Sequence, residues 1–190
     1  VVIKIKLDSK GPILYFQERI GYEGVPFIIY KFRSMHENAE RNRPLLSFNN
    51  DPRVTKWGKV MRKWKLDELP QLINILKGDM SLVGPRPERK YYIDKVLVTN
   101  PCFNCLLQVK PGLTSLGMIS FGYAHNMEQI IRRIEYDRNY IEKYSLSLDF
   151  QIIYYTLRFI LNGKNVWIFH KPYHKYLLTK GPVENQILLK

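Results

Sequence analysis

The 190-residue sequence predicts one mixed α/β domain of the α+β type, in which a small antiparallel sheet or hairpin accompanies several helices. The hydrophobic content of 45% is ordinary for a chain with a single buried core. Short β-branched and aromatic runs occur early in the chain, whereas apolar residues recur at helical spacing later. We therefore expect one domain over 1–190, with its core over 1–165 and a basic C-terminal tail over 166–190.

The predicted strands lie within the first 32 residues. The runs at 1–7 and 13–16 have strand-like composition, and turn-forming residues separate them, which predicts a short hairpin. A third β-branched and aromatic run at 26–32 follows two glycines. This run delivers two cations, Lys31 and Arg33, at its end.

The spacing of apolar residues predicts the helices. At 54–64, tryptophan, valine and methionine recur on one face while lysine and arginine occupy the others, which indicates a basic amphipathic helix. A second helix is expected to begin near Asp67 and to end at Gly78, because glycine commonly follows a helix C-terminus. Further helices are expected at 88–97, 126–143 and 147–161.

The charge balance favours a polyanionic partner. With 30 Lys and Arg against 17 Asp and Glu, the net charge of +13 suits phosphate, nucleic acid or anionic lipid. The 13 Tyr and 3 Trp favour a membrane surface, because their rings suit a boundary between apolar and aqueous phases. The rings of helix 54–64 are expected in the core, with its cationic face toward anionic headgroups. Helix 147–161 is apolar on nearly every face, so it is either central to the core or partly in lipid.

Two further observations bear on location. No run reaches the roughly 18 to 20 apolar residues that a spanning helix needs. The chain begins at Val1, inside an apolar and basic run, which indicates a fragment whose upstream segment is missing. Cys102 and Cys105 form one C-x-x-C, too few cysteines for a disulfide scaffold, so a reducing compartment is expected. A metal or redox site at this pair would have to recruit His125, His170 or His174.

Two adjacent acids, Asp67 and Glu68, stand at the expected start of the second helix. The helix dipole favours ionised carboxylates there, and an ionised carboxylate can act as a nucleophile. Adjacent helical side chains point about 100° apart, so one acid could attack while the other holds a metal. The alternative is that Asp67 only caps the helix.

Pro85 and Pro87 flank Arg86 in a stretch that is expected to be a stiff loop rather than a regular helix. An arginine with little conformational freedom left to lose suits bidentate capture of a phosphate. The alternative is a surface turn with a solvated arginine. Lys31 and Arg33 carry the same ambiguity.

Together these segments resemble the bacterial sugar transferase family, the monotopic polyprenyl-phosphate phosphoglycosyl transferases, also described as undecaprenyl-phosphate sugar phosphotransferases. They occur in the family's order and cover residues 8 to about 160. The longest is Lys77-Gly-Asp-Met-Ser-Leu-Val-Gly-Pro-Arg-Pro87. The others are Asp8-Ser-x-Gly-Pro12, Gln17-x-Arg-x-Gly21, Lys31-Phe-Arg-Ser-Met35, Leu66-Asp-Glu-Leu-Pro-Gln-Leu72, Pro111-Gly-Leu-Thr114, and Tyr136-Asp137 through Leu148-Asp149.

The resemblance implies a covalent mechanism. Asp67 is expected to attack the β-phosphate of a UDP-sugar, giving an aspartyl phosphosugar and UMP, before the sugar phosphate passes to undecaprenyl phosphate. Glu68 is expected to assist at Mg²⁺ and the reacting phosphates, and Asp149 to support the metal or the geometry of the site. The same resemblance makes the segment Pro85, Arg86 and Pro87 a phosphate or nucleotide site, with Lys31 and Arg33 as further candidates.

The resemblance also implies a setting and a pathway. We expect an enzyme on the cytoplasmic face of a bacterial inner membrane, in contact with anionic lipid, at the first membrane step of exopolysaccharide, O-antigen, capsule or glycoprotein glycan synthesis. A homodimer is left open. Members of the family carry an N-terminal hydrophobic helix that enters and leaves one leaflet, and we expect this helix to belong to the upstream segment that is missing from the fragment. The segment 115–123 departs from the Gly-x-x-Gln-Val-x-Gly-Arg pattern of many members, so the sugar stays open.

Two other classes of function remain as alternatives. A basic nucleic-acid-binding module would account for the +13 charge, but no recognition-fold signature is present, so no nucleic acid partner is expected. A peripheral membrane scaffold without turnover would account for the basic and aromatic faces.

Overall fold

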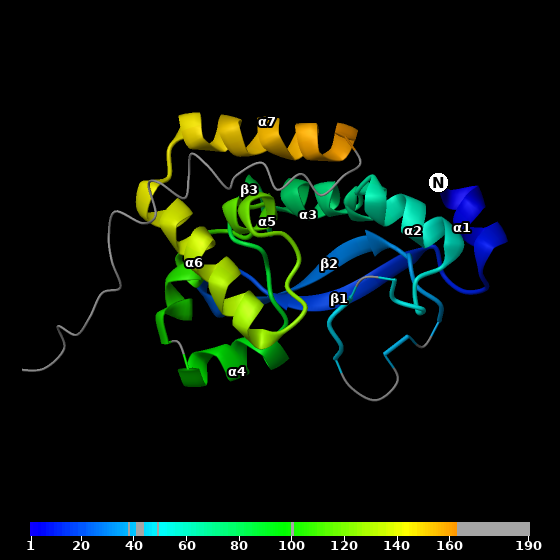
Figure 1. Ribbon diagram of the computed structural model, residues 1–190, viewed down its shortest axis with the longest axis horizontal. Coiled ribbons are helices and arrows are strands. Elements are labelled where there is room, and N and C mark those ends of the chain that lie inside the picture. The colour runs from blue at the N-terminus through cyan, green and yellow to red at the C-terminus, as the bar shows by residue number, and fades with distance from the viewer. Residues whose placement is uncertain (38, 41–43, 49, 100, 163–190) are drawn as a thin grey trace, which may run out of the picture.

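The computed structural model describes residues 1–190 except 38, 41–43, 49, 100 and 163–190, so the predicted tail at 166–190, with His170 and His174, lies outside the described residues. Its elements confirm the mixed α/β class, with several helices and a small antiparallel two-stranded sheet (Figure 1). In chain order they are α1 (Val2–Asp8), β1 (Leu14–Ile20), η1 (Tyr22–Gly24), β2 (Pro26–Phe32), α2 (Lys56–Lys63), η2 (Leu66–Glu68), α3 (Gln71–Lys77), β3 (Ser81–Val83), α4 (Lys90–Thr99), η3 (Pro101–Gln108), β4 (Gly112–Thr114), α5 (Leu116–Ser120), α6 (Met127–Lys143) and α7 (Leu146–Asn162).

The hairpin forms between the second and third predicted strand segments rather than between the first and second. β1 pairs antiparallel with β2, from Leu14 opposite Phe32 to Ile20 opposite Pro26. The prediction of a strand at 1–7 is wrong, because residues Val2–Asp8 form helix α1. Alternating apolar and basic residues in so short a run do not exclude a helix, and here α1 packs on α2.

The predicted amphipathic helix is confirmed as α2, and Asp8 and Thr55 fix its N-terminus. The backbone N–H of Trp57 donates to Asp8 Oδ2 at 2.9 Å, and that of Gly58 donates to Thr55 Oγ1 at 2.9 Å. These side chains satisfy two of the donors that a helix start leaves unpaired. One face of α2 buries Met61, whereas its lysines face outward. Trp64, directly after the helix, is 38% exposed, so the expectation that the tryptophan rings lie in the core is wrong for this residue.

Helix α3 turns its polar side to the protein and its apolar side outward. Asn74 is fully buried, donating to the Ile28 carbonyl at 2.7 Å and accepting from the Tyr30 backbone N–H at 3.1 Å. Because one amide completes hydrogen bonds of two β2 backbone groups, the polar face of α3 can dock on this strand. Gln71 Nε2 on the same helix is buried without a hydrogen-bond partner among the described residues. The apolar residues opposite are exposed, with Leu76 at 88%.

Part of the loop predicted at 78–87 is a strand. β3 pairs in parallel with β4, Ser81 opposite Gly112 and Val83 opposite Thr114, so the fold contains a second, parallel pair beside the hairpin. The backbone at Gly84 lies so close to the segment before β4 that a Cβ added to Gly84 would meet the Lys110 carbonyl. Gly112 N–H also donates to the Pro85 carbonyl at 2.9 Å. The residues after β3 are thereby anchored to the segment around β4.

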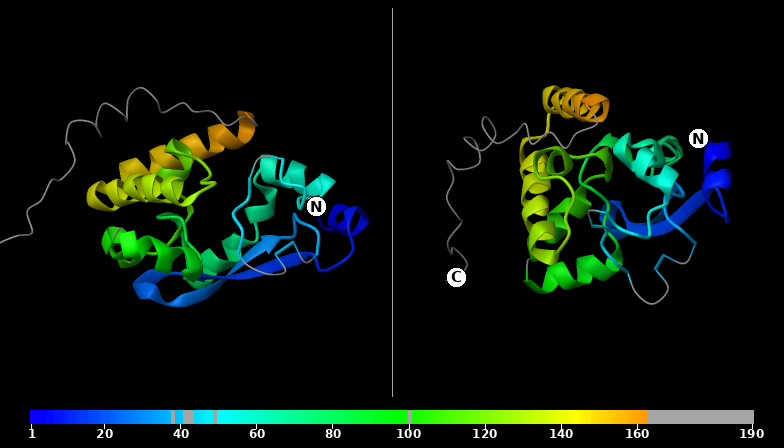
Figure 2. Two further views of the ribbon diagram at one scale, coloured as in Figure 1. Left: turned by 60° about the horizontal axis from the view of Figure 1, so that its bottom comes forward. Right: turned by 45° about the vertical axis from the view of Figure 1, so that its right-hand side comes forward.

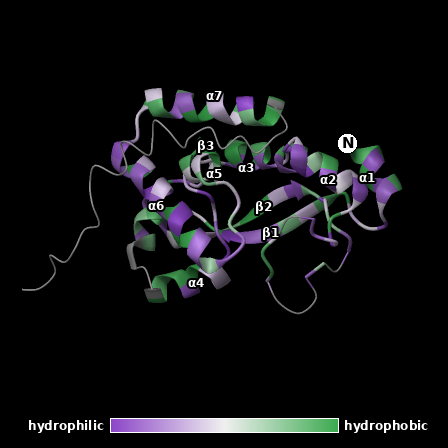
Figure 3. Cartoon of the chain, viewed as in Figure 1, coloured by the Kyte–Doolittle hydropathy of each residue, from purple (hydrophilic) through white to green (hydrophobic). Residues whose placement is uncertain are grey.

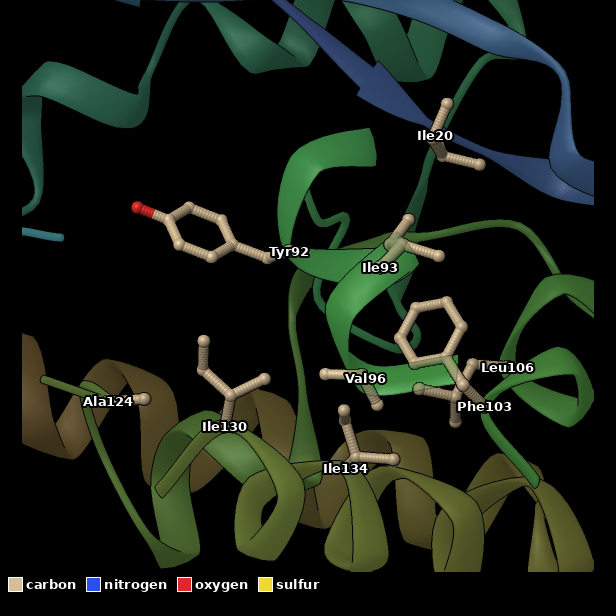
Figure 4. Close-up of a cluster of buried hydrophobic side chains, with 9 residues drawn as sticks. All are labelled: Ile20, Tyr92, Ile93, Val96, Phe103, Leu106, Ala124, Ile130 and Ile134. Carbon is tan, nitrogen blue, oxygen red and sulfur yellow. The ribbon is translucent and has the colours of Figure 1, made fainter. Parts of the chain in front are cut away.

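A hydrophobic core joins the end of β1 to α4, η3 and α6, as Figure 4 shows. The predicted helices at 88–97 and 126–143 are confirmed as α4 and α6, and both contribute to it. Its buried members are Ile20, Tyr92, Ile93, Val96, Phe103, Leu106, Ala124, Ile130 and Ile134. Cys105 packs at the edge of this core from η3.

The helix predicted at 147–161 is confirmed as α7, and it lies at the border of the fold rather than at its centre (Figures 1 and 2). Ile152 is buried against α5, whereas large apolar side chains on its other faces are exposed. α7 occupies the same side of the molecule as α1, α2 and α3, whereas α4 lies on the opposite side (Figure 1). The four helices on the shared side, α1, α2, α3 and α7, carry exposed apolar residues (Figure 3). None of the helices in the described part of the chain combines the length and hydropathy needed to span a membrane.

Candidate active site

The two predicted carboxylates lie side by side in a single 3-10 turn. Asp67 and Glu68 belong to η2, which follows Lys65 in a left-handed conformation with φ of 56°. Helix α3 begins only at Gln71, so the expected helix start near Asp67 is wrong by one turn. Both acids are nevertheless buried, at 7% and 8% exposure. Two adjacent buried carboxylates require compensating charge, because desolvation disfavours their ionised forms.

Glu68 receives this compensation from two cations. Its Oε1 atom accepts from Lys31 Nζ at 2.8 Å and from Arg86 NH2 at 3.2 Å. Burial alone would raise the pKa of Glu68, but Lys31, Arg86 and Lys65 outweigh it and hold the pKa well below its ordinary value. Glu68 is therefore ionised at neutral pH.

Asp67 stands in the opposite electrostatic situation. Burial first, and the neighbouring Glu68 charge second, raise the pKa of Asp67, against the lowering influence of Lys31 and Lys65. No hydrogen bond to its carboxylate is present among the described residues. The pair thus divides into a tethered acid with a lowered pKa and an untethered acid with a raised pKa, as suits a nucleophile beside an electrostatic partner.

Arg86 is held by its backbone as well as by its side chain. Its backbone N–H donates to Asp137 Oδ2 at 3.2 Å, and the Pro87 carbonyl accepts from Arg19 NH1 at 3.1 Å. The flanking Pro85 carbonyl accepts from Gly112, as described above. The prediction of irregular backbone around Arg86 is confirmed for the residues after β3. Besides the two prolines, contacts with α6, β1 and β4 hold this segment.

Behind this loop lies a buried network of charges on α6. Asp137 accepts from Gly117 N–H at 2.7 Å in addition to Arg86, and burial raises its pKa to about 6, against the lowering effect of these bonds and of Arg133. Arg133 forms a buried ion pair with Glu88, which also faces Arg19 at 3.7 Å. Asp137, from the Tyr136-Asp137 motif, thus supports the loop that carries Arg86.

The structure separates two of the predicted site residues from this cluster. The Arg33 guanidinium is buried against the backbone carbonyls of Ser9 and Lys10, and it fixes the loop before β1. Asp149 Oδ1 accepts from Tyr140 at 2.8 Å, between α6 and α7. Within the described ranges, no group of three Asp, Glu, His or Cys side chains is placed to hold a metal, so the structure does not bring Asp149 to the two acids of η2.

Two residues that the sequence did not single out complete the cluster. Lys65 Nζ donates to the Tyr123 hydroxyl and lies 4.1 Å from the centre of its ring, and the Arg86 guanidinium lies 5.7 Å from the same ring. An aromatic face attracts cations, so Tyr123 orients both. The signal available in the sequence was Lys65 directly before the Leu-Asp-Glu motif, but nothing local identified Tyr123, which is 58 residues away.

A cavity of about 420 Å³ opens beside this cluster. Lys65, Glu68 and Arg86 line it at one end, and the remaining walls come from Leu69, β3, β4, α5, the segment before α6, and α7. The walls are largely aliphatic and aromatic, among them Leu113, Met118, Ile119, Phe121, Ile153, Leu157 and Phe159. The site therefore joins a group of charges to an apolar chamber.

The carboxylates fit a magnesium ion that is shared with a substrate. Both Asp67 oxygens and Glu68 Oε2 lack a hydrogen-bond partner among the described residues, so carboxylate oxygens are available. Mg²⁺ is commonly held by one or two carboxylates together with substrate phosphates and water rather than by a full protein cage. The donor set suits that arrangement.

Comparison with known proteins gives a consistent result. The family described as "Bacterial sugar transferase" matches residues 1–163. The UDP-N-acetylgalactosamine-undecaprenyl-phosphate N-acetylgalactosaminephosphotransferase of Aeromonas hydrophila is 43% identical over 161 residues, which are 85% of this chain and 38% of that protein. The UDP-glucose:undecaprenyl-phosphate glucose-1-phosphate transferase of Caulobacter vibrioides is 38% identical over 167 residues, or 87% of this chain and 62% of that protein.

A shorter match is stronger in identity. A Bacillus subtilis protein, described as a putative undecaprenyl-phosphate N-acetylgalactosaminyl 1-phosphate transferase, is 50% identical over 93 residues, which are 49% of this chain and 52% of that protein. The chain thus spans only part of the length of the relatives that it matches.

Proposed function

The chain belongs to the bacterial sugar transferase family, and on that premise we propose that it transfers a sugar 1-phosphate from a UDP-sugar to undecaprenyl phosphate with release of UMP. The observation that carries the proposal is the adjacent buried acids of η2, of which Glu68 is tied to Lys31 and Arg86 while Asp67 is untied. A family of relatives named for sugar phosphate transfer to undecaprenyl phosphate supports the substrate classes.

In the first step, a carboxylate oxygen of Asp67 attacks the β-phosphorus of the UDP-sugar. The bond from that phosphorus to the bridging oxygen breaks, its electron pair leaves with UMP, and the sugar phosphate becomes an acyl phosphate on Asp67. A raised pKa supports this role, because a more basic carboxylate is a stronger nucleophile once it is ionised. Lys31 and Arg86 stand where they can stabilise the charge that develops on the diphosphate.

In the second step, an oxygen of undecaprenyl phosphate attacks the phosphorus of the acyl phosphate. The bond from phosphorus to the Asp67 oxygen breaks, the carboxylate is regenerated, and a lipid-linked diphosphate sugar is released. Asp67 and Glu68 would hold Mg²⁺ together with substrate phosphates, and the ion would offset phosphate charge. Arg86, fixed by Asp137 and Arg19, is positioned by the protein before substrate arrives.

The same proposal includes docking on an anionic membrane surface. Exposed apolar residues gather on α1, α2, α3 and α7, on one side of the molecule (Figure 3). Lys56 and Lys59 of α2 are exposed on the same helix as the half-exposed Trp64. Apolar surface with adjacent cations matches the boundary between headgroups and acyl chains, and the acceptor lipid resides there.

The experiment is UMP release from a panel of UDP-sugars by the complete protein with Mg²⁺, with and without undecaprenyl phosphate. We expect a stoichiometric burst of UMP from one sugar donor alone and continuous turnover when the acceptor lipid is added. Phosphosugar bonded to Asp67 should be recovered from quenched enzyme. Continuous turnover without any enzyme-bound phosphosugar would contradict the covalent step.

A further inference from the structure

We propose that the apolar chamber beside Glu68 binds the acceptor, with the lipid phosphate at Lys65 and Arg86 and the first isoprene units between α5 and α7; this rests on the proposed function. The chamber has a charged end and an apolar remainder, as a prenyl phosphate has. Its lining includes both Glu68 and Arg86 of the reaction site, so a lipid phosphate bound there lies next to the acids of η2.

The charge at this end suits a phosphate. Three cations, Lys31, Lys65 and Arg86, surround two carboxylates, so one positive charge remains even when both acids are ionised. When Asp67 carries the sugar phosphate in the intermediate, its own carboxylate charge is lost. Lys65 is then the cation least committed to Glu68, because its ammonium group donates to a phenol rather than to a carboxylate. An incoming lipid phosphate can replace that phenol as its partner.

The walls suit an isoprenoid chain better than a nucleoside. Thr114 and Thr156 hydroxyls on the wall are bonded to each other at 2.6 Å, and Thr156 also donates to the Ile152 carbonyl at 2.8 Å. Beyond the charged end, the Ser120 hydroxyl is buried without a hydrogen-bond partner among the described residues, and the His125 Nδ1 atom is already paired with a backbone carbonyl at 2.9 Å. These walls thus offer fewer free polar groups than a uracil edge and a ribose require. Aliphatic and aromatic side chains favour burial of a branched hydrocarbon.

The volume and position of the chamber agree with this occupant. At roughly 30 Å³ per non-hydrogen atom, the share that a water molecule takes in the liquid, about 420 Å³ accommodates a phosphate and about two isoprene units. Leu69, Leu82 and Leu157 line the chamber and are also exposed, so it opens onto the molecular surface through apolar residues. The rest of a long lipid chain can leave through this opening toward the apolar faces of α3 and α7.

The test compares two substitutions on α7 in the complete protein. Leu157→Trp adds bulk at the chamber, and Leu161→Trp makes the same change at an exposed position of the same helix that does not line it. We expect Leu157→Trp to raise the KM for undecaprenyl phosphate about tenfold or more while the burst of UMP from donor alone keeps its rate. Leu161→Trp should leave both quantities unchanged. Thermal unfolding of both variants controls for folding.

Two outcomes would overturn the assignment. If Leu157→Trp slows the UMP burst and raises the KM for the UDP-sugar instead, the chamber holds the nucleotide. If both tryptophan variants act alike, α7 contributes only membrane contact. Absence of any UMP burst in the wild-type protein is a different result, which would refute the proposed function itself.

A second measurement needs neither variant nor turnover. A farnesyl phosphate analogue with a diazirine on its first isoprene unit, irradiated with the wild-type protein, should label peptides that contain 113–123 and 153–160. Excess unlabelled undecaprenyl phosphate should suppress this labelling, whereas excess UMP should not. Labelling confined to α1 or α3 would contradict the proposal, even if the protein catalysed no transfer.

Discussion

Lys31, the penultimate residue of β2, and Glu68, the last residue of η2, form an ion pair of 2.8 Å across 37 positions of sequence. Burial lowers the pKa of Lys31, an effect that the neighbouring Glu68 charge only partly offsets. Each group therefore depends on the other for its charged state in a largely desolvated place.

Replacement of Glu68 should cost both stability and activity. In Glu68→Gln, the cations of Lys31 and Arg86 lose their shared counter-charge while the side chain keeps its size. Breaking a buried ion pair from one side typically costs about 3 kcal/mol, so urea unfolding should show a loss of roughly that amount. Exposed Glu128→Gln on α6 is the matched control and should change stability by less than about 0.5 kcal/mol. Equal stability of both variants would contradict the assigned role.

Replacement of Asp67 should separate activity from stability. Asp67→Asn removes the nucleophilic charge, so UMP release should fall by at least roughly 10³-fold, as when a covalent nucleophile is deleted. Burial and the Glu68 charge raise the pKa of Asp67, which means that ionised Asp67 destabilises the fold, and the amide should therefore unfold at the same temperature or higher. Calorimetry and the UMP assay measure the two effects. Wild-type turnover in Asp67→Asn would contradict the covalent step.

The buried Asp137 should make stability depend on pH. Its pKa is raised from 3.8 to about 6 by burial, so between these values the unfolded chain releases a proton that the folded chain keeps. The contribution of Asp137 to stability therefore falls as pH rises through this window and is constant above it, and the difference corresponds to roughly 3 kcal/mol. Relative to Asp137→Asn, the wild-type protein should lose unfolding free energy between pH 4 and 7. Parallel pH profiles of the two proteins would contradict the prediction.

Gly58 should tolerate no side chain although it lies in a helix. Glycine to alanine in an exposed helix normally stabilises by about 1 kcal/mol. A Cβ at this position would instead collide with the backbone carbonyl of Ser34, where α2 crosses the segment after β2. We expect Gly58→Ala to destabilise by roughly 2 kcal/mol or more in urea unfolding. Lys63→Ala, exposed on the same helix, serves as the control and should have little effect.

The lysines of α2 should contribute to membrane affinity. Each lysine near an anionic surface contributes about 1 kcal/mol, so the double replacement of Lys56 and Lys59 by alanine should weaken binding to phosphatidylglycerol vesicles about 30-fold. Lys90 and Lys95 are also exposed, but their helix, α4, lies on the opposite side of the molecule, and their double replacement should have little effect. Sedimentation with vesicles at low and high salt measures both. Equal losses would indicate a response to net charge only.

Regular periodicity predicted the helices well and the strands only in part. α2, α4, α6 and α7 agree with the predicted ranges within a few residues, because each carries a sustained helical pattern. The strand predicted at 1–7 is wrong because the alternation of apolar and basic residues there is too short to specify a strand, and contact with α2 favours a helix. β3 and β4 escaped prediction because three-residue strands contain too little pattern, and their pairing joins residues about 30 positions apart.

The residues of the candidate site could likewise be predicted only in part from the sequence. Motifs in the sequence identified Asp67, Glu68 and Arg86, which the structure brings together with Lys31. Arg33 lies two positions after Lys31, but its side chain donates to the carbonyls of Ser9 and Lys10 in the segment before β1. Local sequence could not separate these two cations, because the difference depends on which distant segment each meets. Tyr123 was missed for the same reason.

Helix α3, which buries its polar side and exposes its apolar side, should also affect how the protein behaves in solution. In aqueous buffer without lipid, the exposed side chains of Leu72, Ile73 and Leu76 present an apolar surface, so we expect concentration-dependent, non-stoichiometric clustering. Detergent should disperse these clusters without changing the fold, since the helix is anchored from its inner side by Asn74. A dimer that disappears when detergent is added would therefore be attributed to contact through this apolar surface of α3.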